Sequence, residues 1–467
     1  MSEPSSPART AVVLGGSHSG MLAARALADS ADRVVVVERD VLPEGPEPRK
    51  GLPQARHAHM LWSGGVRAVE ELLPGITDAL KAAGGRRHPF TTGVVALSAQ
   101  GWFRRWPESH HVILAGRDLL DATIRAQVLA DERIELLDGT EALGLTGTDA
   151  AVTGVRVRAR DGAERTLAAG LVVDATGRGS RAARWLADLG LPAPRIREVD
   201  PGLVYASRLF LAPEAAREGF PVVNLQLDPR GDGPGRSGFL LPIENGRWIV
   251  TLQGTRGGEP TAANEEFVPF AREKLRHPVL GELLERAEPL SDVSVTRATL
   301  NRRHFYERMP AWPENFAVLG DALAVFNPVY GHGLSVAAQS AVRLRQVIRR
   351  HGWGAPGLAR RVQRAVAAPV RAAWDLALGQ DVFHPGATEH GPTLRDRLLS
   401  AYVDRLMYTA TGNGRIARRV TDVTSLERGA QVLLTPGVLL AAAVGPLQPP
   451  LAGPPLTAEE LKAAGVV

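Results

Sequence analysis

The chain has 467 residues, of which 44% are hydrophobic and 22% charged, and its formal net charge at pH 7 is +5. This composition is typical of a globular protein with two or three domains. The absence of cysteine excludes disulfides, thiolate nucleophiles, iron–sulfur clusters and cysteine-type zinc sites, so we expect the chemistry to come from a bound group. The first ten residues lack the apolar core of a signal peptide, which favours a cytoplasmic protein.

Residues 10–40 carry the first binding motif. Their sequence, TAVVLGGSHSGMLAARALADSADRVVVVERD, predicts a strand, a glycine turn, a helix and a second strand that ends at an acidic residue. This is the pattern of a βαβ dinucleotide-binding unit, although a serine replaces its middle glycine. The glycines let a pyrophosphate reach the amides at the helix N-terminus, and the carboxylate can bind ribose hydroxyls. The contacts predicted here are Gly15, Gly16, Ser17, Gly20, Glu38 and Arg39.

A further helix is predicted from Arg117, in the stretch GRDLLDATIRAQVLAD. Leu120, Ile124 and Val128 recur at a spacing of four, so this helix packs inward and its first turn faces the site. Arg117 can therefore pair with a diphosphate or ribityl oxygen.

Residues 134–177 predict strands where a nicotinamide dehydrogenase usually has a second βαβ unit. VRVRA alternates, Asp161-Gly162 turns the chain, and a further apolar strand ends in LVVDATG. A β-meander at this place favours the flavoprotein version of the fold. It also leaves the chain without a second fingerprint for a nicotinamide cofactor.

The stretch VLGDALAVFNPVYGHGLS, residues 318–335, carries the second half of the predicted site. An apolar run ends at Gly320-Asp321, a Pro/Gly loop follows, and a helix is predicted from Leu334. One face of that helix is apolar, with Ala337, Ala341, Leu344 and Ile348. A flavin edge at the start of this helix would lie at the positive end of the helix dipole.

Taken in order, VVLGGSHSG, Glu38, GRDLLD, VVDATGRGS and LGDALAVFNPVYGHG resemble the single-component flavoprotein monooxygenases of the para-hydroxybenzoate hydroxylase type. The resemblance implies an α/β FAD-binding fold of the glutathione-reductase type with a β-meander, an inserted α+β substrate domain with an antiparallel sheet, and a C-terminal helical region. It implies FAD as cofactor, with Asp321 on the ribityl chain. The remaining residues that it places near the pyrophosphate or flavin are Gln54, Arg56, His57, Thr176, Gly177, Pro328, Gly331, His332, Gly333 and Leu334.

A closer resemblance narrows the subgroup. Thr176 and Ser335 depart from the phenolic hydroxylases, whereas RKGLPQARHAHMLWSGG, GRWIV, GTRGGEP and PLTAEEL are similar to the epoxidases of polyether ionophore pathways, such as those for lasalocid and monensin. This implies epoxidation of an apolar polyene, a polyketide, through a C4a-hydroperoxyflavin, with no side-chain nucleophile. O2 and NAD(P)H would be co-substrates, the latter directly or through a separate flavin reductase. The polyene would be free or bound to a carrier protein.

We expect an FAD-binding domain made of residues 8–85, 112–190 and 298–350, a substrate domain of residues 86–111 and 191–297, and a helical region of residues 351–467. The aromatic residues proposed to line the substrate pocket are Trp102, Trp106, Phe210, Phe239 and Tyr330. The histidine pairs at 57/59 and 110/111 do not indicate a metal site, because His57 and His59 have no acidic or cysteine complement nearby.

Two further segments admit more than one interpretation. Residues 322–374 contain eight arginines and no acidic residue, which favours a solvated helix face over a surface for an anionic partner, and no nucleic-acid module is recognisable. The apolar run 432–447 is broken by Pro436-Gly437 and is short for a bilayer, so we expect a buried helix and no membrane span.

Four alternative functions make different predictions. A flavin halogenase would carry a Trp-x-Trp-x-Ile-Pro motif, which this chain lacks. A flavin-dependent aromatic hydroxylase or alkene reductase would share the fold, the latter acting without O2. A noncatalytic flavin-binding module would bind the cofactor without substrate-dependent oxygen uptake.

Overall fold

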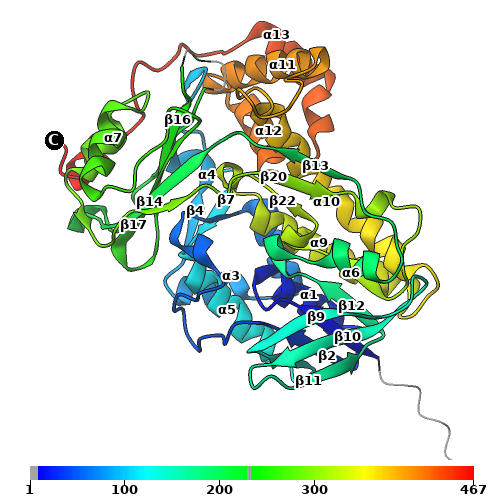
Figure 1. Ribbon diagram of the computed structural model, residues 1–467. Coiled ribbons are helices and arrows are strands. Elements are labelled where there is room, and N and C mark those ends of the chain that lie inside the picture. Colours follow the sequence, from blue (N-terminus) through cyan, green and yellow to red (C-terminus); the bar gives the residue numbers. More distant parts are fainter. Residues whose placement is uncertain (1–8, 229–230, 232) are drawn as a thin grey trace, which may run out of the picture.

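The computed structural model describes residues 9–228, 231 and 233–467 of the chain (Figure 1). Residue 8, the first residue of the predicted FAD-binding domain, lies outside the described residues. Within the described part, no helix combines the length and the apolarity needed to cross a bilayer.

A five-stranded parallel sheet forms the base of the nucleotide-binding half. Val-rich segments form it because both of its faces are buried. Helix α1 (His18–Ala28) joins its first two strands, which confirms the predicted βαβ unit. In spatial order the strands are β21 (Phe316–Val318), β12 (Leu171–Asp174), β1 (Thr10–Leu14), β2 (Arg33–Val37) and β8 (Ile134–Leu137).

The predicted β-meander is confirmed as an antiparallel sheet of β9 (Thr140–Gly147), β10 (Val152–Ala159) and β11 (Glu164–Ala168). The Asp161 carboxylate accepts a 2.9 Å hydrogen bond from the Ala163 amide in the turn between β10 and β11. Helix α5 (Arg117–Leu129) buries the predicted face on the core. Helices α2 (Ser63–Leu72), α3 (Ile76–Ala82) and α6 (Ala182–Asp188) also belong to this part of the chain.

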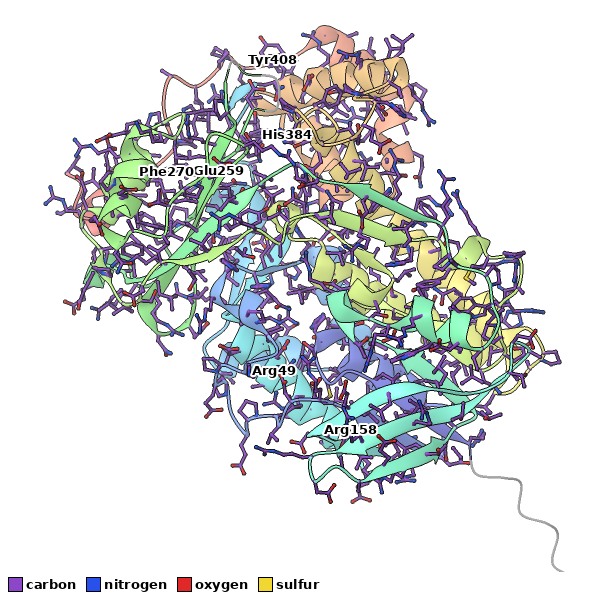
Figure 2. All side chains as sticks on the ribbon, in the orientation of Figure 1. Arg49, Arg158, Glu259, Phe270, His384 and Tyr408 are labelled. Carbon is purple, nitrogen blue, oxygen red and sulfur yellow. The ribbon has the colours of Figure 1, made fainter. Side chains whose placement is uncertain are left out.

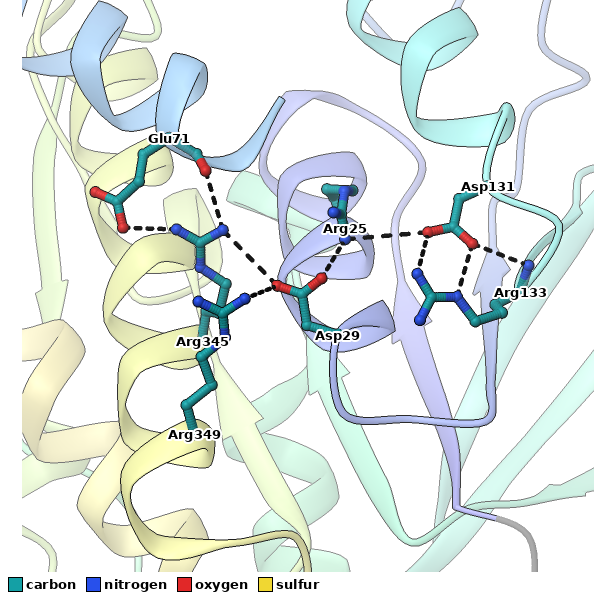
Figure 3. A network of polar contacts seen from close by, with 7 residues as sticks. All are labelled: Arg25, Asp29, Glu71, Asp131, Arg133, Arg345 and Arg349. Atoms are coloured by element: carbon teal, nitrogen blue, oxygen red, sulfur yellow. Dashed lines mark hydrogen bonds and ion pairs between the residues drawn. The ribbon is translucent and has the colours of Figure 1, made fainter. Parts of the chain in front are cut away.

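The long helix α9 (Gly333–His351) packs against α10 (Leu358–Asp381) and buries the apolar face predicted for it. One of its arginines corrects the prediction of a solvated face. The Arg345 side chain is buried because it forms a 2.6 Å ion pair with Glu71 of α2 and lies 3.8 Å from Asp29, which follows α1 (Figure 3). Arg349, which is exposed, pairs with the same Asp29 at 2.7 Å. These ion pairs connect α9 to α2 and to the residue after α1 at the edge of the core.

An eight-stranded, mainly antiparallel sheet forms the other large layer, and it confirms the predicted substrate-domain architecture. Helices α7 (Phe267–Glu273) and α8 (Val279–Leu284) pack on its core of large apolar side chains. Its strands are β18 (Glu288–Pro289), β14 (Val204–Leu211), β17 (Arg247–Gly254), β16 (Arg236–Pro242), β15 (Val222–Leu225), β5 (Val94–Ser98) and β6 (Gly101–Trp102), with β19 (Ser294–Thr296) paired to β14.

The structure contains two further three-stranded sheets. One consists of β3 (Met60–Trp62), β7 (His111–Leu114) and β4 (Arg86–Pro89), with helix α4 (Phe90–Gly93) directly after β4. The other consists of β13 (Ile196–Val199), β20 (Asn301–His304) and β22 (Ala324–Val325). The residue bounds of the domains stay a prediction.

The predicted C-terminal helical region is formed by α11 (Leu394–Thr411), α12 (Gly414–Thr424), α13 (Pro436–Val444) and α14 (Ala458–Ala463). The prediction of a buried helix in residues 432–447 is wrong. In α13 only Val438 and Ala442 are buried, because one side of this short apolar helix packs into the small core of α11 and α12. Leu440 and Val444 remain 68% and 65% exposed.

Candidate active site

The glycine turn after β1 brings α1 into direct contact with the sheet. A Cβ on Gly20 would lie 1.7 Å from the carbonyl oxygen of Gly15, and a Cβ on Gly15, whose φ is +99°, would lie 2.5 Å from the Ala175 carbonyl oxygen. Only hydrogen fits at these positions. The Gly16 amide donates a 2.6 Å hydrogen bond to Glu38 at the end of β2, so this carboxylate lies beside the helix N-terminus.

Arg117 reaches the same turn from α5, as predicted. Its Nε donates to Asp121 at 2.8 Å and its Nη2 to the Ser17 hydroxyl at 3.1 Å. The Ser17 hydroxyl in turn donates to the other Asp121 oxygen at 3.0 Å. Arg117 and Asp121 are both buried, so their mutual neutralisation removes much of the cost of burying each charge.

Arg49 was not predicted as a site residue. It lies in the loop after β2, and Figure 2 labels it beside the nucleotide-binding part. Its side chain is 8% exposed and its guanidinium lies 3.6 Å from Glu38 and 3.8 Å from Asp121. A loop arginine has no periodic pattern that would identify it, and its acidic neighbours become visible only when the chain is folded.

The segment that carries Asp321 contacts the first turn of α1. Gly320 has a φ of +60°, and a Cβ there would lie 2.4 Å from the Ser19 hydroxyl of α1. A Cβ on Gly333 would lie 3.9 Å from Oδ1 of Asp321, so the carboxylate also lies next to the start of α9. Burial raises the pKa of Asp321 above its ordinary value, and the positive charges of Arg178 and Arg117 oppose this shift.

Several buried polar atoms around the starts of α1 and α9 have no hydrogen-bond partner among the described residues. They are His18 Nδ1, Ser19 Oγ, His332 Nδ1 and Ser335 Oγ. Unpaired buried polar groups are costly and rare, so their gathering at two helix N-termini indicates a ligand rich in oxygen atoms. The two serine hydroxyls can donate, whereas both Nδ1 atoms are acceptors, because each neutral ring donates through Nε2 to a carbonyl oxygen. Bare glycines, two carboxylates for hydroxyl groups and these free donors and acceptors fit the pyrophosphate and ribityl chain of a flavin dinucleotide.

The loop before α9 is held against an aromatic residue. Trp62 of β3 donates its indole N–H to the Tyr330 carbonyl oxygen at 3.1 Å, and a Cβ on Gly331 would lie 3.2 Å from the same indole nitrogen. The Asn327 side chain accepts from the Val329 amide. His332 lies 2.9 Å from the Thr424 carbonyl oxygen through Nε2, which must therefore carry the proton.

A buried network fixes the other side of this loop. Asp381, at the end of α10 and 1% exposed, accepts hydrogen bonds from Tyr330 at 2.5 Å, Asn301 at 2.6 Å and Asn327 at 3.0 Å. Tyr205 of β14 donates to Asn327 and accepts from the Val329 amide. Burial raises the pKa of Asp381 above its ordinary value, and its three donors oppose this shift.

Of the predicted residues in the loop 54–57, His57 makes the most specific contact. Its Nδ1 lies 2.8 Å from the Ser207 hydroxyl of β14, and burial, with a smaller effect of Arg56, lowers its pKa to about 4. The side chains of Gln54 and Arg56 are exposed, as is that of Arg39. Their contacts with a cofactor stay predictions.

Thr176 and Gly177, predicted to bind the cofactor, lie next to the glycine turn, and their contacts with FAD stay predictions. The Cα of Thr176 is 3.2 Å from the position of a Cβ on Gly15. The backbone amide and hydroxyl of Thr176 both donate to Asp174, at 2.9 and 2.6 Å, which fixes the segment directly after β12. Gly177 follows with a φ of +79°.

An apolar cluster occupies the face of the eight-stranded sheet next to Trp62. It contains Phe239, which was predicted to line the substrate pocket, and also Trp62 and Phe90. The ring centroids of Trp62 and Phe90 lie 4.8 Å apart. Trp102 and Phe210 belong to the separate core that packs on α7 and α8. Trp106 packs with the C-terminal helices and lines a cavity of about 210 Å³ together with Gly414 and Arg418.

His110 has acidic partners that the sequence did not predict. Its Nε2 lies 3.1 Å from Asp422 and 3.9 Å from Glu427, both more than 300 residues further along the chain. The three groups are close enough to bind one cation. However, Asp422 pairs with Arg419 at 3.1 Å and Glu427 with Arg67 at 2.9 Å, so arginines already neutralise both carboxylates.

Sequence similarity to known proteins agrees with this geometry. Residues 11–188 match the family model of FAD dependent oxidoreductases. The chain belongs to the family of FAD-dependent oxidoreductases. Its sequence is 30% identical over 408 residues to Protein Rv3254 of Mycobacterium tuberculosis (strain ATCC 25618 / H37Rv), and the match covers 83% of each chain.

Solved structures share the fold at low sequence identity. The flavin-dependent brominase Bmp2 matches with a TM-score of 0.62 at 16% identity, over 89% of this chain and 92% of its own. The p-nitrophenol 4-monooxygenase PnpA from Pseudomonas putida DLL-E4 matches with a TM-score of 0.62 at 16% identity, over 90% of this chain and 99% of its own. The predicted fold is thereby confirmed, and the cofactor is FAD.

Proposed function

We propose that this FAD-dependent oxidoreductase is a monooxygenase that epoxidises alkenes of an apolar polyene. The similarity of its motifs to the epoxidases of polyether ionophore pathways favours a polyketide as that polyene. The balanced reaction consumes an alkene, O2, NAD(P)H and a proton, and yields an epoxide, water and NAD(P)+. One oxygen atom joins the alkene carbons and the other leaves as water. The reductant acts directly or through a separate flavin reductase, and the polyene is free or bound to a carrier protein.

The observation that carries this proposal is the apolar aromatic cluster beside the loop that precedes α9. Trp62 touches that loop through its indole N–H and packs on Phe90 through its ring. A flavin lying along the loop would therefore face an apolar surface. Oxygen transfer to an alkene needs such a surface, because water must be excluded while the substrate is held close to the reacting atom.

The residues of this chain would divide the work of holding FAD. The glycine turn and the N-terminus of α1 would bind the pyrophosphate, with Glu38 on the ribose and Arg117 on a phosphate or ribityl oxygen. Asp321 would accept from the ribityl hydroxyls. Bound FAD supplies the electrons with which O2 is activated.

The histidines near the apolar cluster add no positive charge to it at neutral pH. Burial lowers the pKa of His59 to about 3, with Arg117 adding to the effect, and the pKa of His57 to about 4. Both rings are therefore neutral at pH 7. Neutral rings keep this region weakly polar, and neither adds a charge next to an apolar substrate.

Two structural neighbours bear names that suggest related chemistry, namely the monooxygenase PnpA and the brominase Bmp2. The chain lacks the Trp-x-Trp-x-Ile-Pro motif expected of a flavin halogenase. Oxygen insertion is therefore favoured over halogenation. Within oxygen insertion, the departures at Thr176 and Ser335 favour an alkene over a phenol as the acceptor.

The test is a turnover experiment under 18O2 with a panel of apolar polyenes, NAD(P)H and, in parallel, an added flavin reductase. We expect a product heavier by one oxygen atom that carries the label. A product two mass units heavier that is made without O2 would instead identify an alkene reductase. Label from H2 18O in the unopened epoxide would also contradict the proposal.

A pair of variants adds a second readout. Trp62→Ala should raise the fraction of reducing equivalents released as hydrogen peroxide and lower the epoxide yield, because water gains access beside the loop. Trp102→Ala, in the core on α7 and α8, is the control that should leave this ratio unchanged. Equal peroxide release from both variants would contradict the assignment of the Trp62 cluster.

A further inference from the structure

The C-terminal region concentrates exposed apolar side chains. Among the described residues, twelve large hydrophobic side chains are exposed, and eight of them fall between residues 394 and 447. Single exposed leucines are normal on a protein surface, whereas a cluster marks an interaction site. We call the group on and around α13 the α13 patch; its members are Leu434, Leu439, Leu440, Val444 and Leu447.

The patch belongs to an unusually apolar segment. Residues 429–458 contain no charged residue, and α13 is apolar on all sides. A helix of this kind is normally enclosed by protein or lipid. Here Val438 and Ala442 pack into the core with Leu406 and Ile416, and Ala441 packs against it half-buried, whereas Leu439, Leu440 and Val444 of α13 stay exposed among the described residues.

Helix α11 continues the apolar surface. Tyr402 donates a 2.5 Å hydrogen bond to the Leu433 carbonyl oxygen, which directs this side of α11 toward the segment before α13. Leu398 and Leu394 lie one and two turns earlier on the same side of α11, and both are exposed. Figure 1 places α13 at the outer edge of the molecule, next to α11, where it does not face the large sheets.

The charges around the patch are positive. Arg405 donates to the carbonyl oxygens of Ala442 and Ala443 at the end of α13, at 2.5 and 2.8 Å. At the other end, Nη2 of Arg415 lies 3.7 Å from the position of a Cβ on Gly437, and Arg418 is exposed one turn further along α12. The nearby acids do not balance these arginines.

On α12 and directly after it, the acids are Asp422 and Glu427, whose carboxylates are turned inward. Both side chains are less than one tenth exposed and are paired with His110, Arg419 and Arg67. On α11, Asp404 accepts from Gln100 at 3.0 Å and Asp396 accepts from Thr393 at the helix start, while Glu108 near Arg418 pairs with Arg87 at 2.8 Å. An exposed apolar helix with arginines at both ends and acids that are buried or paired matches the arrangement of an interfacial anchor, in which apolar side chains enter the lipid and the guanidinium groups meet anionic headgroups.

We propose that the α13 patch docks on a membrane surface that contains anionic lipid, with α13 lying in the plane of the interface. A second copy of the chain fits less well. A twofold contact that paired α13 antiparallel with its copy would set Arg405 of one chain against Arg415 of the other and would juxtapose like charges. The proposal does not depend on which reaction the enzyme catalyses, although it would place the protein where apolar molecules partition.

The test is sedimentation of the full-length, FAD-loaded protein with vesicles of phosphatidylcholine alone and of an equimolar mixture with phosphatidylglycerol. We expect binding to the mixed vesicles and weaker binding when salt is added, since part of the attraction is electrostatic. Leu439→Asp should lower the partition coefficient at least tenfold. Leu290→Asp is the matched control, because both leucines are 45% exposed, and it should bind like the parent protein.

Two further measurements separate the alternatives. Arg415→Glu combined with Arg418→Glu should weaken binding to the mixed vesicles and leave the melting temperature unchanged, because both side chains are exposed. Light scattering of the parent protein and Leu439→Asp reports the oligomeric state. A dimer that Leu439→Asp dissociates would assign the patch to a second copy and overturn the proposal, as would absence of binding to the mixed vesicles.

Discussion

The phenol of Tyr330 donates a 2.5 Å hydrogen bond to the buried carboxylate of Asp381, which lies 51 residues further along the chain. Tyr330 belongs to the loop before α9, and Asp381 ends α10. The bond therefore ties the loop proposed to run along the flavin to a helix outside the nucleotide-binding sheet.

Removal of Asp381 should cost more stability than removal of the tyrosine hydroxyl. Tyr330→Phe removes one hydrogen bond and should lower the free energy of unfolding by about 1 kcal/mol. Asp381→Ala leaves Tyr330, Asn301 and Asn327 without their acceptor and should cost about 3 kcal/mol. Urea denaturation of the two variants gives both values. Equal costs would mean that the two asparagines find other partners.

The Asp321 carboxylate should contribute directly to FAD affinity. Asp321→Ala removes a charge-assisted hydrogen bond proposed for the ribityl chain and should weaken FAD binding by ~1.5 to 3 kcal/mol, or roughly ten- to a hundredfold. Fluorescence titration of the apoprotein measures this change. Asp149→Ala, at an exposed acid in a turn of the meander, is the control. Unchanged affinity in a folded Asp321→Ala protein would place the carboxylate away from the cofactor.

The glycine turn offers a steric test. Gly20→Ala would put a methyl group 1.7 Å from the Gly15 carbonyl oxygen, so α1 must move away from β1. We expect a loss of stability of at least ~2 kcal/mol and a protein that purifies with little FAD. Gly179→Ala lies in open space, has no positive φ and should change neither quantity. Thermal melts and the flavin absorbance of the purified proteins distinguish the two outcomes.

His332 should make stability depend on pH between about 4 and 6.5. Burial lowers its folded pKa to about 4 from the ordinary 6.5. In this window the unfolded chain binds a proton that the folded chain does not, so stability falls as the pH is lowered. The loss per histidine is about 1.4 kcal/mol per pH unit.

The measurement compares the parent protein with His332→Asn, which keeps an N–H donor but cannot titrate. Between pH 6.5 and 5 the stability of the parent should fall more steeply than that of the variant. The difference between the two slopes isolates His332 from the other buried histidines and carboxyl groups. Parallel slopes would show that the folded ring titrates near its ordinary pKa and takes up its proton together with the unfolded chain.

The sequence by itself determined the elements of the nucleotide-binding half. Glycine spacing, alternation of apolar residues and a terminal acid are local patterns, and they predicted β1, α1, β2, the meander and the α9 face because each depends on residues close in the chain. The same patterns predicted that Gly15, Glu38 and Arg117 belong to one site, and the family resemblance added Asp321 to it.

Only the tertiary structure decided the contacts between distant segments. Arg49 lies close to Asp121, His110 pairs with Asp422, and Tyr330 donates to Asp381. These contacts form because folding closes long loops, and a local sequence pattern cannot predict which distant side chains then face each other. The apolarity of residues 432–447 likewise did not decide burial. A hydrophobic helix is buried only where other elements supply a surface for every face, and α11 and α12 cover one side of α13 alone.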